Sequence, residues 1–210
     1  MNIINISDCE LLAKGGTRLI YQNPINKNKI FKVNINIEDR LKLHPIKKVI
    51  RFIAPSTKLR DIKIESQAYI NYFISIPEVA SSIFPCFFGF THTSFGFAIC
   101  YEKLSDSKGN MAPTLLQIVQ NGEYSKVHKI ALNSLVKILK NNHIIQNDFS
   151  PKNFVFANDK FYIVDGLGDK HVVRIRTISR SINNIYILKK TRRLAKKLNL
   201  SYNLVSGNFI

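Results

Sequence analysis

Two carboxylates in the second half of the chain stand beside short apolar runs, and this arrangement constrains the fold most. In the stretch HIIQNDFSPKNFVF, residues 143–156, Asp148 and Asn153 precede an apolar run. In FYIVDGLG, residues 161–168, Asp165 closes another apolar run. Short apolar runs separated by turn residues predict two paired strands. The first stretch is therefore either an ordinary surface turn or the loop that supplies the base and a metal ligand in a phosphotransferase.

The composition is typical of a globular protein with a strongly cationic surface. Among 210 residues, 45% are hydrophobic, and 31 Lys and Arg against 14 Asp and Glu give a formal net charge of +17. This length suits one sizeable core or two small lobes. No apolar run is long enough to predict a membrane span, and the N-terminus lacks the pattern of a secretory signal. Three scattered cysteines predict no disulfide framework, so we expect a cytoplasmic protein.

The first half of the chain predicts a sheet and one helix. Residues 10–35 predict a β-meander, whereas residues 36–56 are irregular and predict an insertion or a mobile loop. Residues 57–76 predict a helix that carries Glu65 on an apolar and aromatic stripe. Two strands around a polar turn should follow and end at Tyr101–Leu104.

The second half begins with a polar stretch, which predicts a lobe boundary near residue 105. An amphipathic helix is expected over residues 124–142. Residues 170–197 contain ten Lys and Arg and no acidic residue. The predicted fold class is α+β, with a nucleotide-binding N-terminal lobe over residues 1–104 and a reduced helical C-terminal lobe over residues 105–210.

The order of chemical groups along the chain matches what phosphoryl transfer requires. Backbone amides and a lysine must hold the nucleotide phosphates, Mg²⁺ requires oxygen ligands, and a carboxylate must orient the acceptor hydroxyl. Asp148 and Asn153 keep the five-residue step of the kinase catalytic loop, and Asp165 precedes a glycine as the metal-binding aspartate does. Before them the chain offers a hairpin with glycines, then Lys32 in a strand and Glu65 in a helix.

These motifs resemble the protein-kinase-like superfamily and, more closely, the YrbL family, whose members are described as PhoP regulatory network proteins. The resemblance rests on LAKGGTRLIYQNP, KIFKV, DIKIESQAY, HIIQNDFSPKNFVF, FYIVDGLGD and the basic segment KKTRRLAKKL. It covers nearly the whole chain and is weakest over residues 36–56 and 105–125. The resemblance implies a minimal two-lobe protein-kinase-like fold with a reduced C-lobe that binds ATP and Mg²⁺, but it names no phosphate acceptor.

The resemblance also implies a role for each candidate residue. Lys32 would contact the α- and β-phosphates of ATP and be held by Glu65. Asp148 would orient the acceptor or act as the base, and Asn153 and Asp165 would bind Mg²⁺. A glycine turn near the phosphates and a hinge beside the adenine would be formed by Gly15, Gly16, Tyr101, Glu102, Lys103 and Leu104.

Several positions depart from the kinase pattern. The glycine loop reads KGGTR, Gln146–Asn147 replaces the usual His-Arg, and Ser150 stands where a lysine is usual. The metal-binding motif reads DGLG without a phenylalanine, and no A-P-E segment follows. Asp61 is the alternative to Glu65 as partner of the lysine. A pseudokinase, or a regulatory binding module without phosphotransfer, is therefore the alternative to an ATP-dependent phosphotransferase.

A basic amphipathic helix is expected over residues 185–200. Its basic face either stays solvated while the helix docks, or contacts an anionic lipid, nucleic acid or acidic protein surface. Aromatic side chains are not interleaved with these charges, so base stacking is not indicated. The cations on this face are Lys189, Lys190, Arg192, Arg193, Lys196 and Lys197.

Overall fold

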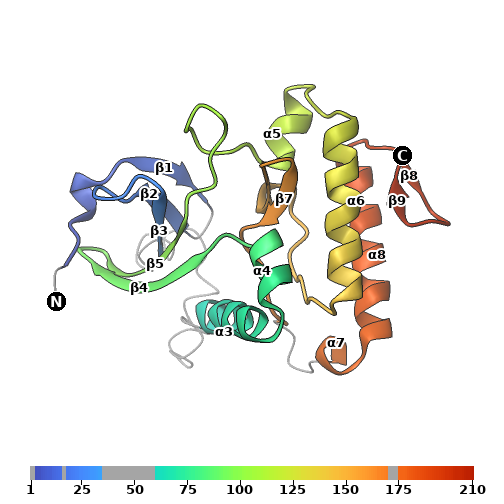
Figure 1. The fold of residues 1–210 in the computed structure, drawn as a ribbon, viewed down its shortest axis with the longest axis horizontal. Coiled ribbons are helices and arrows are strands. Elements are labelled where there is room, and N and C mark those ends of the chain that lie inside the picture. Colours follow the sequence, from blue (N-terminus) through green and yellow to red (C-terminus); the bar gives the residue numbers. More distant parts are fainter. Residues whose placement is uncertain (1–2, 16–17, 35–59, 170–174) are drawn as a thin grey trace, which may run out of the picture. The chain divides into compact units, whose positions relative to one another are not determined.

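The computed structural model shows an α+β protein, which confirms the predicted fold class (Figure 1). An antiparallel sheet of five strands is built from the first half of the chain, and most of the helices come from the second half. The structure describes residues 3–15, 18–34, 60–169 and 175–210. Gly16 and the insertion predicted over residues 36–56 lie outside these ranges.

The chain divides into two compact units. The first consists of Met1–Arg60 and Pro85–Leu104, and the second of Asp61–Phe84 and Ser105–Ile210. Both the predicted lobes and these units separate the chain after Leu104, but the helix that carries Glu65 is grouped with the second unit. The nucleotide-binding role predicted for the N-terminal lobe stays a prediction.

The first unit is a sheet with strand order β1-β2-β3-β5-β4, in which all neighbours are antiparallel. The predicted turn between the second and third strands is stabilised by Asn23, whose side-chain oxygen accepts hydrogen bonds from the backbone N–H groups of Ile25 and Asn26. The strands are β1 (Leu11–Lys14), β2 (Arg18–Gln22), β3 (Lys29–Asn34), β4 (Phe87–Thr93) and β5 (Gly96–Glu102).

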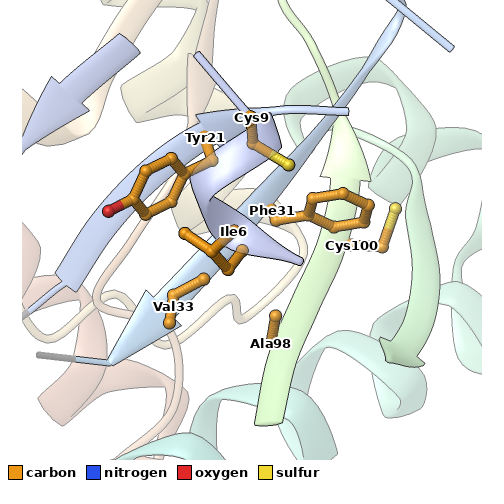
Figure 2. Close-up of a cluster of buried hydrophobic side chains, with 7 residues drawn as sticks. All are labelled: Ile6, Cys9, Tyr21, Phe31, Val33, Ala98 and Cys100. Carbon is orange, nitrogen blue, oxygen red and sulfur yellow. The ribbon is translucent and has the colours of Figure 1, made fainter. Parts of the chain in front are cut away.

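One face of this sheet carries a hydrophobic core (Figure 2). Phe31 and Val33 of β3 lie opposite Cys100 and Ala98 of β5, so these four side chains share one face. The short 3₁₀ helix η1 (Ile6–Asp8) contributes Ile6 to the same cluster. Because side chains alternate along a strand, the residue between Phe31 and Val33 is placed on the opposite face, and that residue is Lys32.

The second unit is mainly helical, and its long helices follow from their sequence patterns. The inward positions of α6 are apolar, as predicted, and α6 and α8 pack side by side (Figure 1). Thr114 and Gln117 form a capping box at the start of α5, and the Ser179 side chain caps α8 by accepting from the Ile182 N–H. None of the described helices has the length and apolar character that a membrane crossing requires. The helices are α3 (Arg60–Ser75), α4 (Pro77–Ile83), α5 (Leu115–Gln120), α6 (Lys126–Asn141), α7 (Ile175–Ile178) and α8 (Arg180–Lys197).

Two small hairpins complete this unit. The predicted hairpin of β6 (Phe154–Ala157) and β7 (Lys160–Ile163) turns through Asn158 and Asp159, which have positive φ angles of 50° and 58°. A second hairpin of β8 (Tyr202–Asn203) and β9 (Asn208–Phe209) does not follow from the sequence pattern. Its anchor is Asn133 of α6, whose amide makes two hydrogen bonds with the backbone of Phe209.

Candidate functional site

The loop that contains the predicted catalytic base forms backbone hydrogen bonds with the segment that contains the predicted metal ligand. The N–H of Asn147 donates to the carbonyl of Gly166 at 2.8 Å, and the N–H of Gly168 donates to the carbonyl of Ile145 at 2.9 Å. These bonds flank an antiparallel bridge between the two segments. Residues far apart in the sequence are therefore held side by side at the end of the β6–β7 hairpin.

Gln146 ties the predicted site residues together. Its side chain is fully buried, and its Nε2 donates to the main-chain carbonyls of Asp148 at 2.8 Å and Asp165 at 2.9 Å. Asn153 stands in the 3₁₀ turn η3 (Pro151–Asn153), and its Nδ2 donates to the same Asp148 carbonyl at 3.2 Å. Asp148, Asn153 and Asp165 are thus brought together in one unit.

Gly166 is required by the closeness of these two segments. It has a φ of +88°, which side chains rarely adopt. A Cβ atom at this position would stand 2.8 Å from the Cβ of Asp148 and 3.1 Å from its backbone nitrogen. The Asp-Gly pair in the sequence therefore has a steric reason, because only glycine lets Asp165 approach the loop this closely.

The side chains of Asn153 and Asp165 carry the hard oxygen atoms that a divalent cation prefers. An amide whose Nδ2 is committed to a carbonyl offers its Oδ1 to a cation, and Asn153 is in this situation. The Asp165 carboxylate accepts a hydrogen bond from the Gly166 N–H at 2.7 Å, which fixes its direction. Within the described ranges, no group of three or more His, Cys, Asp or Glu side chains could hold a metal. An ion here would depend on this amide and carboxylate together with ligand oxygens.

Asp148 is exposed to solvent. Its Oδ1 accepts a hydrogen bond from the Ser150 N–H at 3.0 Å, so the loop itself holds the side chain in place. The other oxygen can accept a proton or a hydrogen bond from an incoming hydroxyl.

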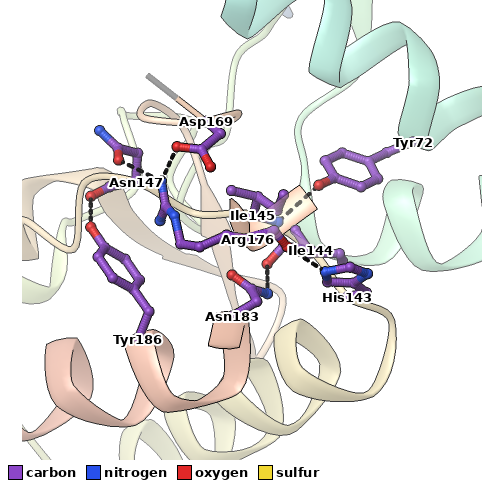
Figure 3. Close-up of polar contacts among 9 residues, drawn as sticks. All are labelled: Tyr72, His143, Ile144, Ile145, Asn147, Asp169, Arg176, Asn183 and Tyr186. Carbon is purple, nitrogen blue, oxygen red and sulfur yellow. Dashed lines mark hydrogen bonds and ion pairs between the residues drawn. The ribbon is translucent and has the colours of Figure 1, made fainter. Parts of the chain in front are cut away.

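Helix α3 packs against both segments of the site. A Cβ atom on Gly168 would lie 2.6 Å from the Cγ2 and 3.1 Å from the backbone carbonyl oxygen of Ile64, so the helix backbone passes close to the residues after Asp165. The Tyr72 hydroxyl accepts a hydrogen bond from the Ile145 N–H at 2.8 Å (Figure 3), and burial raises the pKa of Tyr72. Glu65 is fully buried on the inward face of this helix, which is not the position of a solvated surface carboxylate.

Lys32 lies on the sheet of the first unit, opposite the hydrophobic core. It is only 7% exposed, and its ammonium stands 4.6 Å from the centroid of the Tyr101 ring. A buried ammonium is costly unless anionic or aromatic groups compensate for its lost hydration. Lys32 is therefore not an exposed strand lysine, whereas its contact with Glu65 stays a prediction.

The remaining predicted nucleotide contacts also belong to the first unit. The Gly15 N–H donates to the Arg18 carbonyl at 2.8 Å and closes the turn between β1 and β2. At the end of β5, the Glu102 carboxylate accepts from the Cys86 N–H at 3.0 Å. The following residues, Lys103 and the buried Leu104, leave the sheet at the predicted hinge.

A buried ion pair lies beside the loop (Figure 3). No motif in the sequence predicts it. The Arg176 Nη2 lies 2.5 Å from the Asp169 Oδ1 and donates to the Asn147 Oδ1 at 2.9 Å. The two charged side chains are 6% and 2% exposed. The guanidinium also stacks over the ring of Tyr186 at 4.1 Å. Arg176 thus places an arginine next to Asn147, the position where the kinase pattern has its own arginine.

Helix α8 adds further bonds to the same loop (Figure 3). The Tyr186 hydroxyl donates to the Asn147 carbonyl at 2.9 Å, and the Asn183 amide donates to the Ile144 carbonyl at 3.1 Å. Both residues lie on the inward side of α8, and the amphipathic pattern predicted for this helix does not indicate these two contacts. The loop is therefore held by three helical segments, α3, α7 and α8.

Residues 4–199 match the family described as PhoP regulatory network protein YrbL. The chain belongs to this family. No curated protein matches the sequence. The match to the YrbL family includes every candidate residue described above, from Gly15 to Asp165, and the Arg176 ion pair. It ends before the β8–β9 hairpin.

Proposed function

We propose that this YrbL-family protein has a minimal protein-kinase-like fold, binds Mg-ATP and transfers the γ-phosphoryl group to a hydroxyl acceptor. The observation that carries the proposal is the bridge made by Gln146 between the carbonyls of Asp148 and Asp165. It holds a candidate base and a candidate metal ligand together through the fold itself. An ordinary surface turn does not require a buried amide in this position.

Each residue of the second unit has a distinct task under this proposal. Asp148 orients the acceptor hydroxyl and takes its proton through the oxygen that Ser150 does not fix. Asn153 and Asp165 hold Mg²⁺, which neutralises charge on the phosphates of the bound nucleotide. Positioning rather than covalent chemistry provides most of the rate in such a site.

The first unit would bind the nucleotide. Lys32 supplies a positive charge that is already shielded from water, and such a charge interacts more strongly with phosphate than a solvated one. Glu65, buried on α3, would hold that ammonium in place. The backbone at Gly15 and Gly16 would approach the phosphates, and Tyr101–Leu104 would line the adenine.

The Arg176 ion pair supports a site that is assembled without modification. In kinases with a long activation segment, phosphorylation orders that segment through new arginine contacts. Here the carboxylate of Asp169 already forms an ion pair with Arg176 beside the loop. In the unmodified protein, the loop is therefore already held by the buried Arg176.

A regulatory module that binds nucleotide without transferring phosphate is the second candidate. Its support is Ser150, which stands where a kinase places a lysine near the transferred phosphate. Without a lysine at position 150, nucleotide binding would persist while turnover is lost; the loop's own lysine, Lys152, stands two positions further along. The two candidates share the fold and the metal ligands, so they differ only in the chemical step.

A nucleotide titration with phosphate release followed in the same sample tests the proposal. Wild type should bind ATP only with Mg²⁺ and release phosphate or label an acceptor. Asp165→Ala should lose Mg²⁺-dependent binding, whereas Asp148→Asn should bind but not turn over. Binding by wild type without turnover favours the regulatory module. Absence of Mg²⁺-dependent binding would refute both candidates.

A further inference from the structure

The outward face of α8 combines isoleucines with cations, an arrangement that a merely solvated basic helix does not need. Ile182 and Ile185 are 43% and 66% exposed. At steps of three and four residues, the same face continues with cations. The inward positions are already filled by Ile187, Thr191 and Leu194, so the outward isoleucines are not part of the core. The exposed cations that follow are Lys189, Arg192, Arg193, Lys196 and Lys197.

The structure corrects one residue of the predicted basic face. Lys190 is half-buried, and its ammonium lies 5.1 Å from the Tyr186 ring, close to the site loop. Five of the six predicted cations are exposed, and Lys190 is the one that turns inward. The basic face of α8 therefore covers a narrower part of the helix surface than predicted. The N-terminal part of this outward face is apolar.

The β8–β9 hairpin lies beside α8 (Figure 1). A Cβ atom on Gly207 would lie 2.7 Å from the Cδ2 of Leu188, which shows that the hairpin packs on α8. Burial raises the pKa of Tyr202 in β8, and the nearby positive charge of Arg192 opposes this rise. At the hairpin tip, Leu204 and Val205 are 64% and 99% exposed.

The sequence that forms this surface contains basic residues without acidic ones. From residue 175 to 210 the sequence has no Asp or Glu. The acidic residue that precedes this region, Asp169, is buried and paired with Arg176. The surface therefore presents exposed aliphatic groups and positive charges next to each other.

We propose that the outward face of α8 and the tip of the β8–β9 hairpin dock on a bilayer that contains anionic lipids. An interfacial helix lies in the headgroup region with aliphatic side chains in the acyl boundary and Lys and Arg among the anionic headgroups. Nucleic acid would use the cations but not the isoleucines, and stacking on bases requires aromatic side chains. Charge alone fits both partners, but the aliphatic groups fit the lipid.

Vesicle flotation of the full chain tests this surface. Vesicles of phosphatidylcholine with phosphatidylserine should bind the protein, and vesicles of phosphatidylcholine alone should bind it much less. Arg192→Gln with Arg193→Gln should weaken binding about thirtyfold, since each cation near an anionic surface contributes about 1 kcal/mol. Lys126→Gln with Lys137→Gln is the matched control. These two exposed lysines lie on α6, and replacing them removes the same charge as replacing the two arginines.

Ile182→Gln with Ile185→Gln separates lipid docking from general attraction to polyanions. This variant keeps every charge, so it should bind single-stranded RNA or heparin like wild type but bind the anionic vesicles at least about tenfold more weakly. Both residues are exposed, so thermal unfolding should stay unchanged. Equal vesicle binding by this variant and wild type, or equal losses in the arginine variant and its lysine control, would overturn the proposal. Binding to RNA without vesicle binding would overturn it as well.

Discussion

Gly166 approaches Asp148 so closely that the two residues leave no room for a side chain between them. The contact joins the loop of the candidate base to the segment of the candidate metal ligand. It depends on the absence of one carbon atom and on a backbone conformation that glycine adopts without strain. Substitutions here and in the neighbouring bonds therefore test how the site is built.

Gly166→Ala should be much more harmful than the same change at another glycine with a positive φ. Gly109 has a φ of +82°, and a Cβ atom there would meet nothing within 4 Å, so Gly109→Ala costs only backbone strain, about 1 to 3 kcal/mol. Gly166→Ala should cost about 1 to 3 kcal/mol more, because the methyl group must displace the Asp148 backbone. Urea unfolding of both variants measures the difference. Equal losses would show that the two segments are not in contact.

Gln146→Glu should destabilise the protein although the side chain keeps its shape. An ionised carboxylate has no donor, so the carbonyls of Asp148 and Asp165 lose their hydrogen bonds, at a cost of about 2 kcal/mol or more. Gln117→Glu is the matched control, since the Gln117 side chain accepts hydrogen bonds from Thr114 and a glutamate can still accept them. Denaturant midpoints should fall for the first variant and stay near wild type for the second.

The Arg176–Asp169 pair should show strong coupling in a double-mutant cycle. Arg176→Met leaves a carboxylate buried without its arginine and should cost about 3 to 5 kcal/mol. Adding Asp169→Leu removes that carboxylate, so the double variant should be more stable than Arg176→Met alone. Additive losses in chemical unfolding would show that the two charges do not interact.

His128 should make the protein less stable in mild acid. Burial lowers the pKa of His128 below its usual value, with Glu123 acting in the opposite direction. The Nδ1 of His128 accepts a hydrogen bond from the Ser125 N–H at 3.2 Å, and this bond requires a neutral ring. The ring of Phe156 packs against it, with 4.4 Å between the two ring centroids. The unfolded chain takes up the proton more readily, so stability is full above the ordinary histidine pKa and is lost as the pH falls below it.

His128→Gln removes this titration and keeps an acceptor at the start of α6. Melting temperatures measured from pH 7.5 downward should fall faster for wild type than for the variant once the pH passes about 6.5. Parallel curves for the two proteins would show that other groups cause the loss in acid.

Elements with a strong local pattern could be predicted from the sequence. The strands of the sheet, the hairpin of β6 and β7, and α6 follow from their alternation or helical periodicity. The burial of Glu65 follows from its place on the apolar stripe of α3. The steps from Asp148 to Asn153 and from Asp165 to Gly166 indicate the candidate site only together with the helix before them and the hairpin between them, and its function stays a prediction.

Features that depend on long-range contacts could not be predicted. The strands β8 and β9 have two residues each and are anchored by Asn133, which is 76 residues away from its partner Phe209. The helix α5 has only six residues, although a Thr-x-x-Gln capping signal at Thr114 marks its start. Gln146 is a departure from the kinase pattern in the sequence, and its bridging role becomes visible only when Asp165 lies beside it.

The burial of the Arg176–Asp169 pair implies that dissolved salt acts on this protein in two unequal ways. Counterions screen charges that face water, but they do not reach side chains that are 6% and 2% exposed. A rise in ionic strength would thus detach the outward cations of α8 from an anionic surface and leave the internal arginine in place. Under the proposed docking, high ionic strength weakens the attachment to the membrane and leaves the loop around Asp148 intact.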